Sequence, residues 1–511
     1  MTPEHFSEQI SEHHSDRTAD RTVDAVVIGL GPGGEDLAAR LAGGGWRVLG
    51  VEAHLVGGEC PYYGCIPSKM MLHESRRGHP DWHRVATRIR AEATDHWDDT
   101  VAVERLTDAG VTFLRGHAEI QGGTAGTADQ AGAAGKAGMA VGASVTVTPE
   151  GGSPQLWTAR RAVVLNTGSA PVLAPVPGLP ERAAWTHRDV VTAETLPDSL
   201  AIVGGGPVAC ELAQALAGFG VRVTLLVRGD RLLSGEVPEA GDLVAERFRS
   251  EGIDVRTHTE ITEVSEADAT RYESSHGLPT PSGPVDVALS TGDRIHVDRV
   301  LLATGRAPRD EVRVDEWCRV LDAAGDPVPG RYALGDMTGA GPFTHTSVAQ
   351  SAVVAGQLLG ANHGVGARPY PRNAVPRVTY TNPEVAAVGL SEDAARADAA
   401  SAGGQDRGAG GEGRGSDGVR VARVDLASSS RGWIDEVAGH LTLVARGGGP
   451  DGGLVLVGAT VVGPGAGEIL GALTVAVHAR VPVAELARIP WAYPTLHRAI
   501  GDALGKLSQG A

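Results

Sequence analysis

The chain has 511 residues, a length that suggests about three domains and a core large enough to need no disulfide staples. Its 45 basic and 62 acidic side chains give a formal net charge of −17, which disfavours nucleic acid and anionic lipid as partners. No run of about 18 apolar residues occurs, the polar first segment lacks a signal-peptide pattern, and there are only four cysteines. We therefore expect a cytoplasmic protein with neither a membrane span nor a disulfide framework.

The first part of the chain alternates between polar and strand-like segments. Residues 1–22 are charged and aperiodic, so we expect a disordered tail. Val23–Gly29 is typical of a short buried strand, a glycine turn and an apolar-periodic helix follow, and Trp46–Glu52 is typical of a second strand. This order predicts a βαβ unit.

The glycine turn of this unit fits the pattern G-x-G-x-x-G with Gly29, Gly31 and Gly34. The first glycine allows the tight turn, the second lets a diphosphate approach the backbone, and the third packs the helix against the strand. Glu52 ends the second strand, where a carboxylate can accept a hydrogen bond from a ribose hydroxyl. We predict a dinucleotide site, with a packing turn that binds no ligand as the alternative.

A second unit of the same kind begins at Leu200. Its turn contains Gly204 and Gly206 and ends in alanine, a G-x-G-x-x-A variant. At the position that corresponds to Glu52 stands Val227, and Arg228 follows it. An apolar residue followed by arginine suits a 2′-phosphate, so we predict NADPH rather than NADH. The alternative is that Arg228 is only a solvated surface charge.

The remaining segments complete an α/β architecture. Three runs end in glycine turns and are typical of strands: Arg161–Gly168, Arg299–Gly305 and Gly330–Asp336. From Pro371 onward the pattern changes to antiparallel strands interleaved with helices. Two Gly-rich insertions, 122–142 and 400–418, are expected to be disordered loops. We predict two Rossmann-like dinucleotide-binding domains followed by a C-terminal α+β domain.

Two cysteines, Cys60 and Cys65, follow the first βαβ unit. In a regular helix this spacing puts the Cα atoms about 8–9 Å apart, beyond the roughly 7 Å that a disulfide spans. Pro61 and Gly64 would distort the helix and let the sulfurs meet, near a helix N-terminus that lowers the thiol pKa. We therefore favour a redox-active pair over a zinc site, which would need further ligands, or an inert disulfide.

The segment from Gly57 to Lys69, GGECPYYGCIPSK, resembles the GGTCLNVGCIPSK motif of the pyridine nucleotide–disulfide oxidoreductases. Their class I members include dihydrolipoamide dehydrogenase, glutathione reductase and mercuric reductase. The resemblance covers about residues 23–505 and includes ATGRAPR (Ala303–Arg309), ALGD (Ala333–Asp336) and TNPEVAAVGL (Thr381–Leu390). It implies an FAD enzyme that oxidises NADPH, forms a homodimer and needs no metal.

The resemblance also implies domain bounds and site residues. The domains would be a tail at 1–22, an FAD-binding domain at 23–172 and 297–370, an NAD(P)-binding domain at 173–296 and a dimerisation domain at 371–511. FAD would be bound by Gly29, Gly31, Gly34, Glu52, Gly58, Lys69, Ala118, Thr167, Gly168, Gly335 and Asp336. NADPH would be bound by Gly204, Gly206, Val208, Glu211, Arg228 and Gly305.

Electrons would pass from NADPH through FAD to a Cys60–Cys65 disulfide. The resemblance implies that Cys65 is the flavin-proximal thiol and that Cys60 attacks the substrate. Lys69 would lie near the reactive edge of the flavin and pair with Glu211, whereas an ordinary ion pair between helices is the alternative. The acceptor would be a disulfide or another small molecule, such as a quinone or a metal ion.

The C-terminal segment departs from the family pattern. The family's dithiol reductases carry a motif like HPTxxE there, whose His is the acid–base group for the partner's thiols and whose Glu orients that His. Here Tyr493 stands in the His position and Arg498 in the Glu position, with His497 as a less favoured substitute. Tyrosine is a poor base at neutral pH, but Tyr493 can still donate a hydrogen bond to a thiolate or a carbonyl.

Three other functions remain open at this point. The first is a diaphorase that reduces quinones or metal ions without needing the disulfide, and the second is an enzyme like dihydrolipoyl dehydrogenase. A flavin-binding redox sensor or scaffold is the non-enzymatic alternative.

Overall fold

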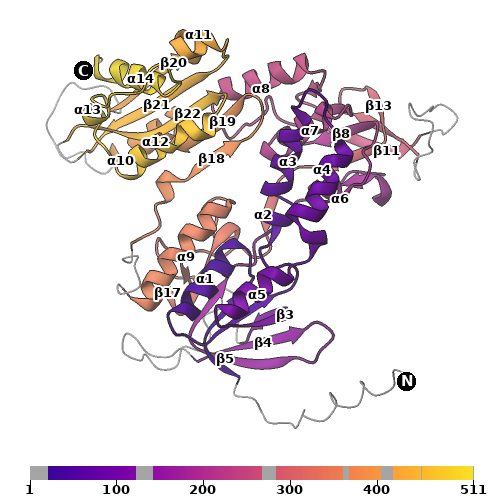
Figure 1. Cartoon of the computed structure of the whole chain (residues 1–511), viewed down its shortest axis with the longest axis vertical. Helices are drawn as coiled ribbons and strands as arrows, with labels where there is room; N and C mark the ends of the chain where they lie inside the picture. The colour runs from indigo at the N-terminus through magenta and orange to yellow at the C-terminus, as the bar shows by residue number, and fades with distance from the viewer. Residues whose placement is uncertain are drawn as a thin grey trace, which may run out of the picture.

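The computed structural model describes residues 21–121, 142–267, 283–360, 368–403, 418–449 and 452–509. Two bodies built on parallel sheets and a third on an antiparallel sheet make up the molecule (Figure 1). This arrangement agrees with the predicted fold class. Residues 1–20 of the predicted tail, and 122–141 and 404–417 of the predicted insertions, lie outside the described residues.

The first body contains a seven-stranded sheet. Its parallel part runs β3–β2–β1–β5–β17, and β4 pairs antiparallel with β3 and β5. The strands are β1 (Thr22–Ile28), β2 (Val48–Glu52), β3 (Val111–Ile120), β4 (Ala143–Pro149), β5 (Gln155–Leu165), β16 (Arg319–Leu321) and β17 (Pro327–Ala333). The helices are α1 (Pro32–Gly43), α5 (Thr100–Asp108) and α9 (Thr344–Leu359). β1 begins at Thr22, one residue inside the predicted tail, because that residue already pairs with Thr158 of β5.

The second body contains a parallel sheet in the order β10–β9–β8–β14–β7. Its elements are β7 (Ala184–Trp185), α6 (His187–Thr192), β8 (Ser199–Val203), α7 (Pro207–Gly218), β9 (Arg222–Leu226), α8 (Pro238–Ser250), β10 (Asp254–Arg256) and β14 (Arg299–Leu302). A small antiparallel sheet joins it, made of β11 (Ile261–Glu266), β12 (Val285–Leu289) and β13 (Arg294–Val297).

The position of β14 corrects one predicted domain boundary. The boundary between 296 and 297 assigned this strand to the first body, but β14 pairs with β7 and β8 of the second sheet. The chain crosses between the bodies at a two-stranded ribbon of β6 (Ser169–Pro171) and β15 (Arg306–Pro308). The structural boundary therefore follows β14 instead of preceding it.

The third body contains the antiparallel sheet β18–β19–β22–β21–β20, as the alternating pattern after Pro371 predicted. Its strands are β18 (Pro376–Thr379), β19 (Glu384–Gly389), β20 (Val419–Asp425), β21 (His440–Gly447) and β22 (Leu454–Gly463). Its helices are α10 (Glu392–Gly403), α11 (Ser430–Ile434), α12 (Ala466–His478), α13 (Val483–Leu486) and α14 (Arg498–Gln509). The prediction of a loop over 400–418 is wrong at residues 400–403, because α10 continues to Gly403.

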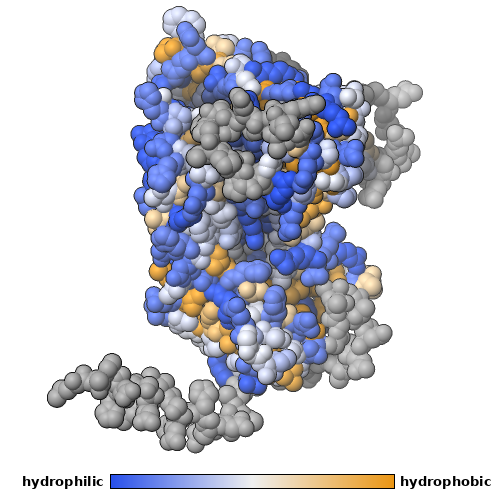
Figure 2. Space-filling model, turned by 90° about the vertical axis from the view of Figure 1, so that its right-hand side faces the viewer, coloured by the Kyte–Doolittle hydropathy of each residue, from blue (hydrophilic) through white to orange (hydrophobic). Residues whose placement is uncertain are grey.

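The surface is mostly polar. The face in Figure 2 is largely hydrophilic, with apolar residues in small groups. Within the described ranges, no helix is both long and apolar enough to cross a bilayer.

Candidate active site

One large cavity, about 1510 Å³ in volume, is lined by both glycine turns and both redox cysteines. That volume exceeds the roughly 300–1,000 Å³ of a site for one drug-sized ligand. The predicted residues that line it are Gly29, Gly31, Glu52, Gly58, Cys60, Cys65, Ala118, Thr167, Gly168, Gly204, Gly206, Val208, Arg228, Gly305, Gly335 and Asp336. The predicted residues that do not line it are Gly34, Lys69, Glu211 and Tyr493.

The first glycine turn fits a dinucleotide diphosphate. Gly29 has φ +90°, and a Cβ there would lie 2.3 Å from the carbonyl oxygen of Asn166. Gly31 faces the cavity, and its only close neighbour would be the Asn166 amide nitrogen at 3.4 Å. Gly31 is also the N-cap of α1 and offers no side-chain cap, so the first N–H groups of the helix are free to bind an anion.

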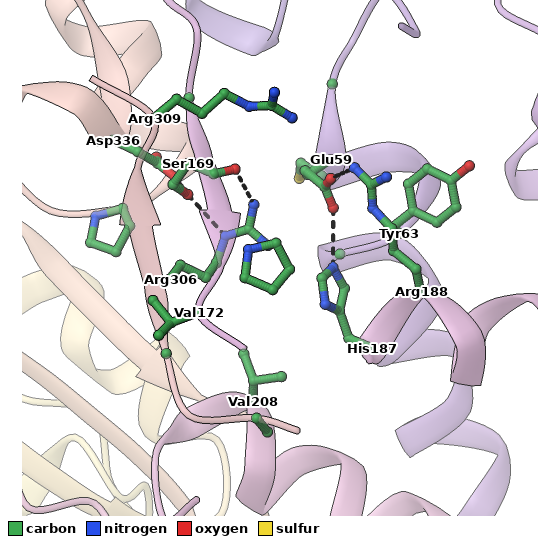
Figure 3. A pocket seen from close by; sticks show the side chains of 18 of the residues that line it. Glu59, Tyr63, Ser169, Val172, His187, Arg188, Val208, Arg306, Arg309 and Asp336 are labelled. Atoms are coloured by element: carbon green, nitrogen blue, oxygen red, sulfur yellow. Dashed lines mark hydrogen bonds and ion pairs between the residues drawn. The ribbon is translucent and has the colours of Figure 1, made fainter. Parts of the chain in front are cut away.

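Polar groups at the cavity wall are held in place before any ligand binds. The Glu52 carboxylate accepts hydrogen bonds from the backbone N–H groups of Leu30 and His54, at 2.7 and 2.9 Å. On the wall near β6, Ser169 donates to Asp336 and Arg306 donates to Ser169 (Figure 3). These oxygens can accept from hydroxyl groups of a sugar or a polyol chain, as FAD carries.

The second glycine turn has the same construction. Gly204 has φ +132°, and a Cβ there would lie 2.3 Å from the carbonyl oxygen of Ala303. Gly206 would meet no atom within 4 Å and caps α7 without a side-chain bond. Arg228 reaches the cavity with 87% of its side chain exposed, and its Nε lies 3.8 Å from Glu260. The guanidinium is thus accessible to an anionic ligand.

The redox segment forms two short helices, α2 (Glu59–Tyr62) and α3 (Cys65–Ser75), which are separated at Gly64. This break confirms the predicted distortion and puts Cys65 at the first position of α3. Both cysteines are free thiols, and each has a large effect on the pKa of the other.

The two thiols have opposite pKa shifts. The hydrogen bond from Cys65, with smaller contributions from Thr344 and Lys69, outweighs burial and lowers the pKa of Cys60 to about 6. Cys65 donates this hydrogen bond and would lose it on ionising, so the bond, together with burial, raises the pKa of Cys65. Cys60 is therefore the thiolate of the pair at neutral pH. Thr344, which hydrogen-bonds both thiols, carries no sequence signal and was missed.

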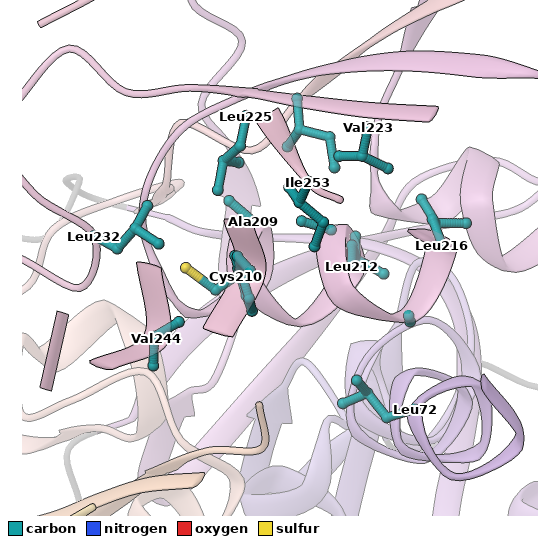
Figure 4. Close-up of a cluster of buried hydrophobic side chains, with 14 of the residues drawn as sticks. Leu72, Ala209, Cys210, Leu212, Leu216, Val223, Leu225, Leu232, Val244 and Ile253 are labelled. Carbon is teal, nitrogen blue, oxygen red and sulfur yellow. The ribbon is translucent and has the colours of Figure 1, made fainter. Parts of the chain in front are cut away.

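The predicted pair of Lys69 and Glu211 is present. Lys69 Nζ lies 2.8 Å from Glu211 Oε2, and the Glu211 side chain is only 7% exposed. The pair joins α3 to α7, whose apolar faces also pack together. Figure 4 shows Leu72 of α3 beside the cluster of α7, which includes Leu212 and Leu216. Cys210 lies fully buried in this cluster, and burial raises the pKa of its thiol.

A cluster that the sequence did not predict faces Asp336 and Arg306 across the cavity (Figure 3). Glu59 contacts His187 Nε2 at 3.1 Å and pairs with Arg188, whose guanidinium lies 4.7 Å from the centre of the Tyr63 ring. Burial and, less strongly, Arg306 lower the pKa of His187 to about 4. More than 120 residues separate Glu59 from His187, and no local pattern relates them.

Tyr493 lies in the third body. Its side chain is 73% exposed, and its hydroxyl donates to Ser430 Oγ at 2.9 Å. Arg498 pairs with Asp502 on α14, and His497 directly precedes that helix. Within one subunit, none of these three residues lines the cavity. Among the described residues, no group of three or more His, Cys, Asp and Glu is arranged to hold a metal ion.

Comparison with known proteins identifies the class. The pyridine nucleotide-disulphide oxidoreductase family matches residues 23–357, and its dimerisation domain matches residues 375–504. The chain belongs to this family. It is accordingly an FAD-dependent oxidoreductase that uses NAD(P)H, and its dimerisation domain supports a homodimer.

Named relatives align over almost the whole chain. Mercuric reductase of Acidithiobacillus ferrooxidans is 30% identical over 92% of this chain and 80% of its own length. Glutathione reductase of Burkholderia cepacia is 30% identical over 92% and 96%, and dihydrolipoyl dehydrogenase of Geobacillus stearothermophilus is 28% identical over 92% and 93%.

Solved structures share the fold. LpdA from Mycobacterium tuberculosis and the HOCl-induced flavoprotein disulfide reductase RclA from Escherichia coli each superpose with a TM-score of 0.73 at 23% identity. They cover 95% and 94% of this chain, and 100% and 99% of their own.

Gly34 offers a direct test of the first turn. A Cβ at Gly34 would lie 2.0 Å from the carbonyl oxygen of Gly29, so Gly34→Ala must push α1 away from the turn. We expect FAD binding to weaken by at least about tenfold, measured as flavin absorbance per protein and by titration of the apoprotein. Gly43→Ala is the matched control, because a Cβ at that end of the same helix meets nothing within 4 Å. Full flavin content in Gly34→Ala would contradict this reading.

The lowered pKa of Cys60 predicts its reactivity in the reduced protein. Only the thiolate is alkylated, so the rate at Cys60 should be high at neutral pH and fall as the pH drops through about 6. Cys65 should remain slow over the same range. Iodoacetamide labelling, resolved by mass spectrometry, measures both, and Cys60→Ser identifies the Cys60 signal. A midpoint near the ordinary value of 9.0 would refute the assignment.

Proposed function

We propose that this enzyme reduces a small acceptor with electrons from NADPH, through the redox couple of Cys60 and Cys65. NADPH and one proton from solvent convert the disulfide to the dithiol and leave NADP⁺. The dithiol then transfers two electrons to the acceptor and returns to the disulfide. When bound, FAD supplies the two-electron transfer between the nicotinamide and the disulfide. The observation that carries the proposal is the position of Cys60 and Cys65 together in the cavity that both glycine turns line.

For a disulfide acceptor, the opposite pKa shifts of Cys60 and Cys65 support different roles for the two thiols. The Cys60 thiolate attacks one sulfur of the acceptor, forms a mixed disulfide and releases the other sulfur as a thiolate, which takes up a proton. Cys65 then attacks Cys60, restores the disulfide and releases the second thiol. Lys69 supports the first step, because its charge lowers the pKa of Cys60.

The cofactor sites follow from the same cavity. We propose that FAD occupies the first turn, held by Gly29, Gly31, Gly58 and Glu52, with Asp336 toward its polyol chain; Ala118, Thr167, Gly168 and Gly335 line its site. NADPH would occupy the second turn with Gly204 and Gly206, and Val208 and Gly305 line that part.

The acceptor itself is proposed by class. A disulfide is favoured by the nucleophilic character of Cys60, and relatives are named for mercuric ion, glutathione and dihydrolipoyl chemistry. A specific observation favours a second candidate, direct reduction of a quinone or a metal ion. Tyr493 replaces the base that thiol exchange needs, and its hydroxyl is bonded to Ser430. In the proposed homodimer, Tyr493 of one subunit serves the redox site of the other.

An anaerobic titration with NADPH separates the two candidates. If the disulfide is active, two-electron reduction should produce a long-wavelength absorption band from a thiolate beside FAD. Cys60→Ser removes the thiolate whose hydrogen bond is the main cause of the raised pKa of Cys65, so Cys65 can ionise and should show such a band before any NADPH is added. Cys65→Ser should show none. Disulfide reduction should fall by at least about a hundredfold in both variants. Bleaching without a band, with quinone reduction unchanged in Cys60→Ser, would favour the second candidate.

Arg228 tests the choice of coenzyme. A charge-assisted hydrogen bond to the 2′-phosphate should make NADPH the preferred donor, and Arg228→Leu should raise KM for NADPH about tenfold. KM for NADH should change little, because NADH lacks that phosphate. Arg222→Leu is the matched control, since Arg222 is exposed on β9 but does not line the cavity. An equal loss for both coenzymes, or a wild-type preference for NADH, would contradict the proposal.

A further inference from the structure

The segment between β18 and β19 belongs to the third body but docks against the helices that carry the redox site. It contains Tyr380 and the start of the TNPE motif, to which the proposed function assigns no role. Gln214 of α7 accepts from Asn382 N at 2.7 Å and donates to Asn382 O at 3.0 Å. Arg76, just after α3, donates to the carbonyl oxygen of Tyr380. The segment is thus tied to both α3 and α7.

Tyr380 contacts both members of the buried ion pair. Its backbone N–H donates to Glu211 Oε1 at 2.9 Å, while the other oxygen of that carboxylate takes the Lys69 ammonium at 2.8 Å. Its ring lies under the same ammonium, with Nζ 4.7 Å from the ring centre. A cation at that distance from an aromatic face is attracted to it. Tyr380 therefore binds the Glu211 carboxylate with its backbone and the Lys69 ammonium with its side chain.

Lys69 lies one helical turn after Cys65 on α3, close enough for its charge to act on the thiols. That charge is one of the smaller influences that lower the pKa of Cys60, and it opposes the raised pKa of Cys65. The titratable groups that act on Tyr380 are Lys69, Glu211, Glu384 and Cys65. Burial is the main cause that raises the pKa of the Tyr380 hydroxyl, so the ring is neutral at physiological pH. A neutral ring leaves the positive field of Lys69 at the thiols intact.

We propose that Tyr380 is a positioning residue for Lys69 and that, through Lys69, it contributes to the reactivity of the Cys60–Cys65 dithiol. Glu211 and the Ser68 hydroxyl bind the ammonium at 2.8 and 3.3 Å, and the Tyr380 ring adds a third contact that restrains a side chain still 34% exposed. The third body thereby contributes to the redox site of its own chain. This inference rests on the proposed role of the dithiol, not on the identity of the acceptor.

The test is alkylation of the reduced, FAD-loaded protein about one unit below the pKa of Cys60. At that pH the rate follows the thiolate fraction. Tyr380→Leu should slow the labelling of Cys60 by up to about threefold, the upper bound set by the free energy of one partly exposed cation–π contact. Tyr380→Phe keeps the ring and should match the wild type. In a Lys69→Met background, Tyr380→Leu should have no further effect, because the group through which it acts is gone.

Three results would overturn the inference: an unchanged rate in Tyr380→Leu, a loss in Tyr380→Phe as large as in Tyr380→Leu, or an equal loss with and without Lys69. Circular dichroism and flavin content verify folding. If Tyr380→Leu does not fold, Tyr380→Trp decides, because its larger ring should give a rate at least that of the wild type, and a slower rate would refute the role. Alkylation requires neither NADPH nor an acceptor, so a failed acceptor assignment leaves this test standing.

Discussion

The ion pair between Lys69 and Glu211 is the contact on which the arrangement of the redox site depends. A carboxylate as buried as that of Glu211 is costly unless its charge and its lone pairs are matched. Here one oxygen takes the Lys69 ammonium and the other takes a backbone N–H, so the desolvation cost is offset on both sides. Removing either partner would leave an unmatched charge between α3 and α7. The close approach of these helices adds a steric constraint, since a Cβ at Gly218 would lie 2.8 Å from Ser75 Cβ. The redox helix and the second dinucleotide unit are therefore fixed as one body.

A chain with net charge −17 must still hold two anionic dinucleotides, and it does so with local fields. Both glycine turns present uncapped helix N-termini to the cavity, which concentrates partial positive charge where diphosphates would lie. Glu59 adds a negative charge to the same cavity, next to Cys60. Arg188 compensates that charge, and the contacts of Glu59 with Arg188 and His187 tie α2 to α6 of the second body. The electrostatics of the cavity therefore differ from those of the whole surface.

The sequence predicted the features whose cause is local. Glycine turns between strand and helix, the spacing of Cys60 and Cys65, and the interruption at Gly64 depend on neighbours a few residues away, and the structure contains all of them. The domain boundary before β14 was wrong, because RVLLATG has the same strand–Thr–Gly pattern as the strand at 161–168, and only pairing with β8 shows which sheet it joins. The prediction of a loop over 400–418 was wrong at residues 400–403, because it followed the Gly-rich composition of the whole segment and missed that α10 continues to Gly403. Thr344, His187 and Tyr380 reach the site from distant segments, so no local pattern indicates them.

The pKa of Cys60 bears on the departure at Tyr493. A thiol that ionises near pH 6 needs no base to become a nucleophile at neutral pH, so replacing the family's histidine does not stop the first attack on an acceptor. What the histidine also supplies is a proton for the thiolate that leaves. A tyrosine hydroxyl already bonded to Ser430 can stabilise such a thiolate by a hydrogen bond, but transfers a proton reluctantly. Under the proposed function, a disulfide acceptor therefore needs a good leaving group to react at this site, whereas a quinone or a metal ion, which releases no thiolate, does not.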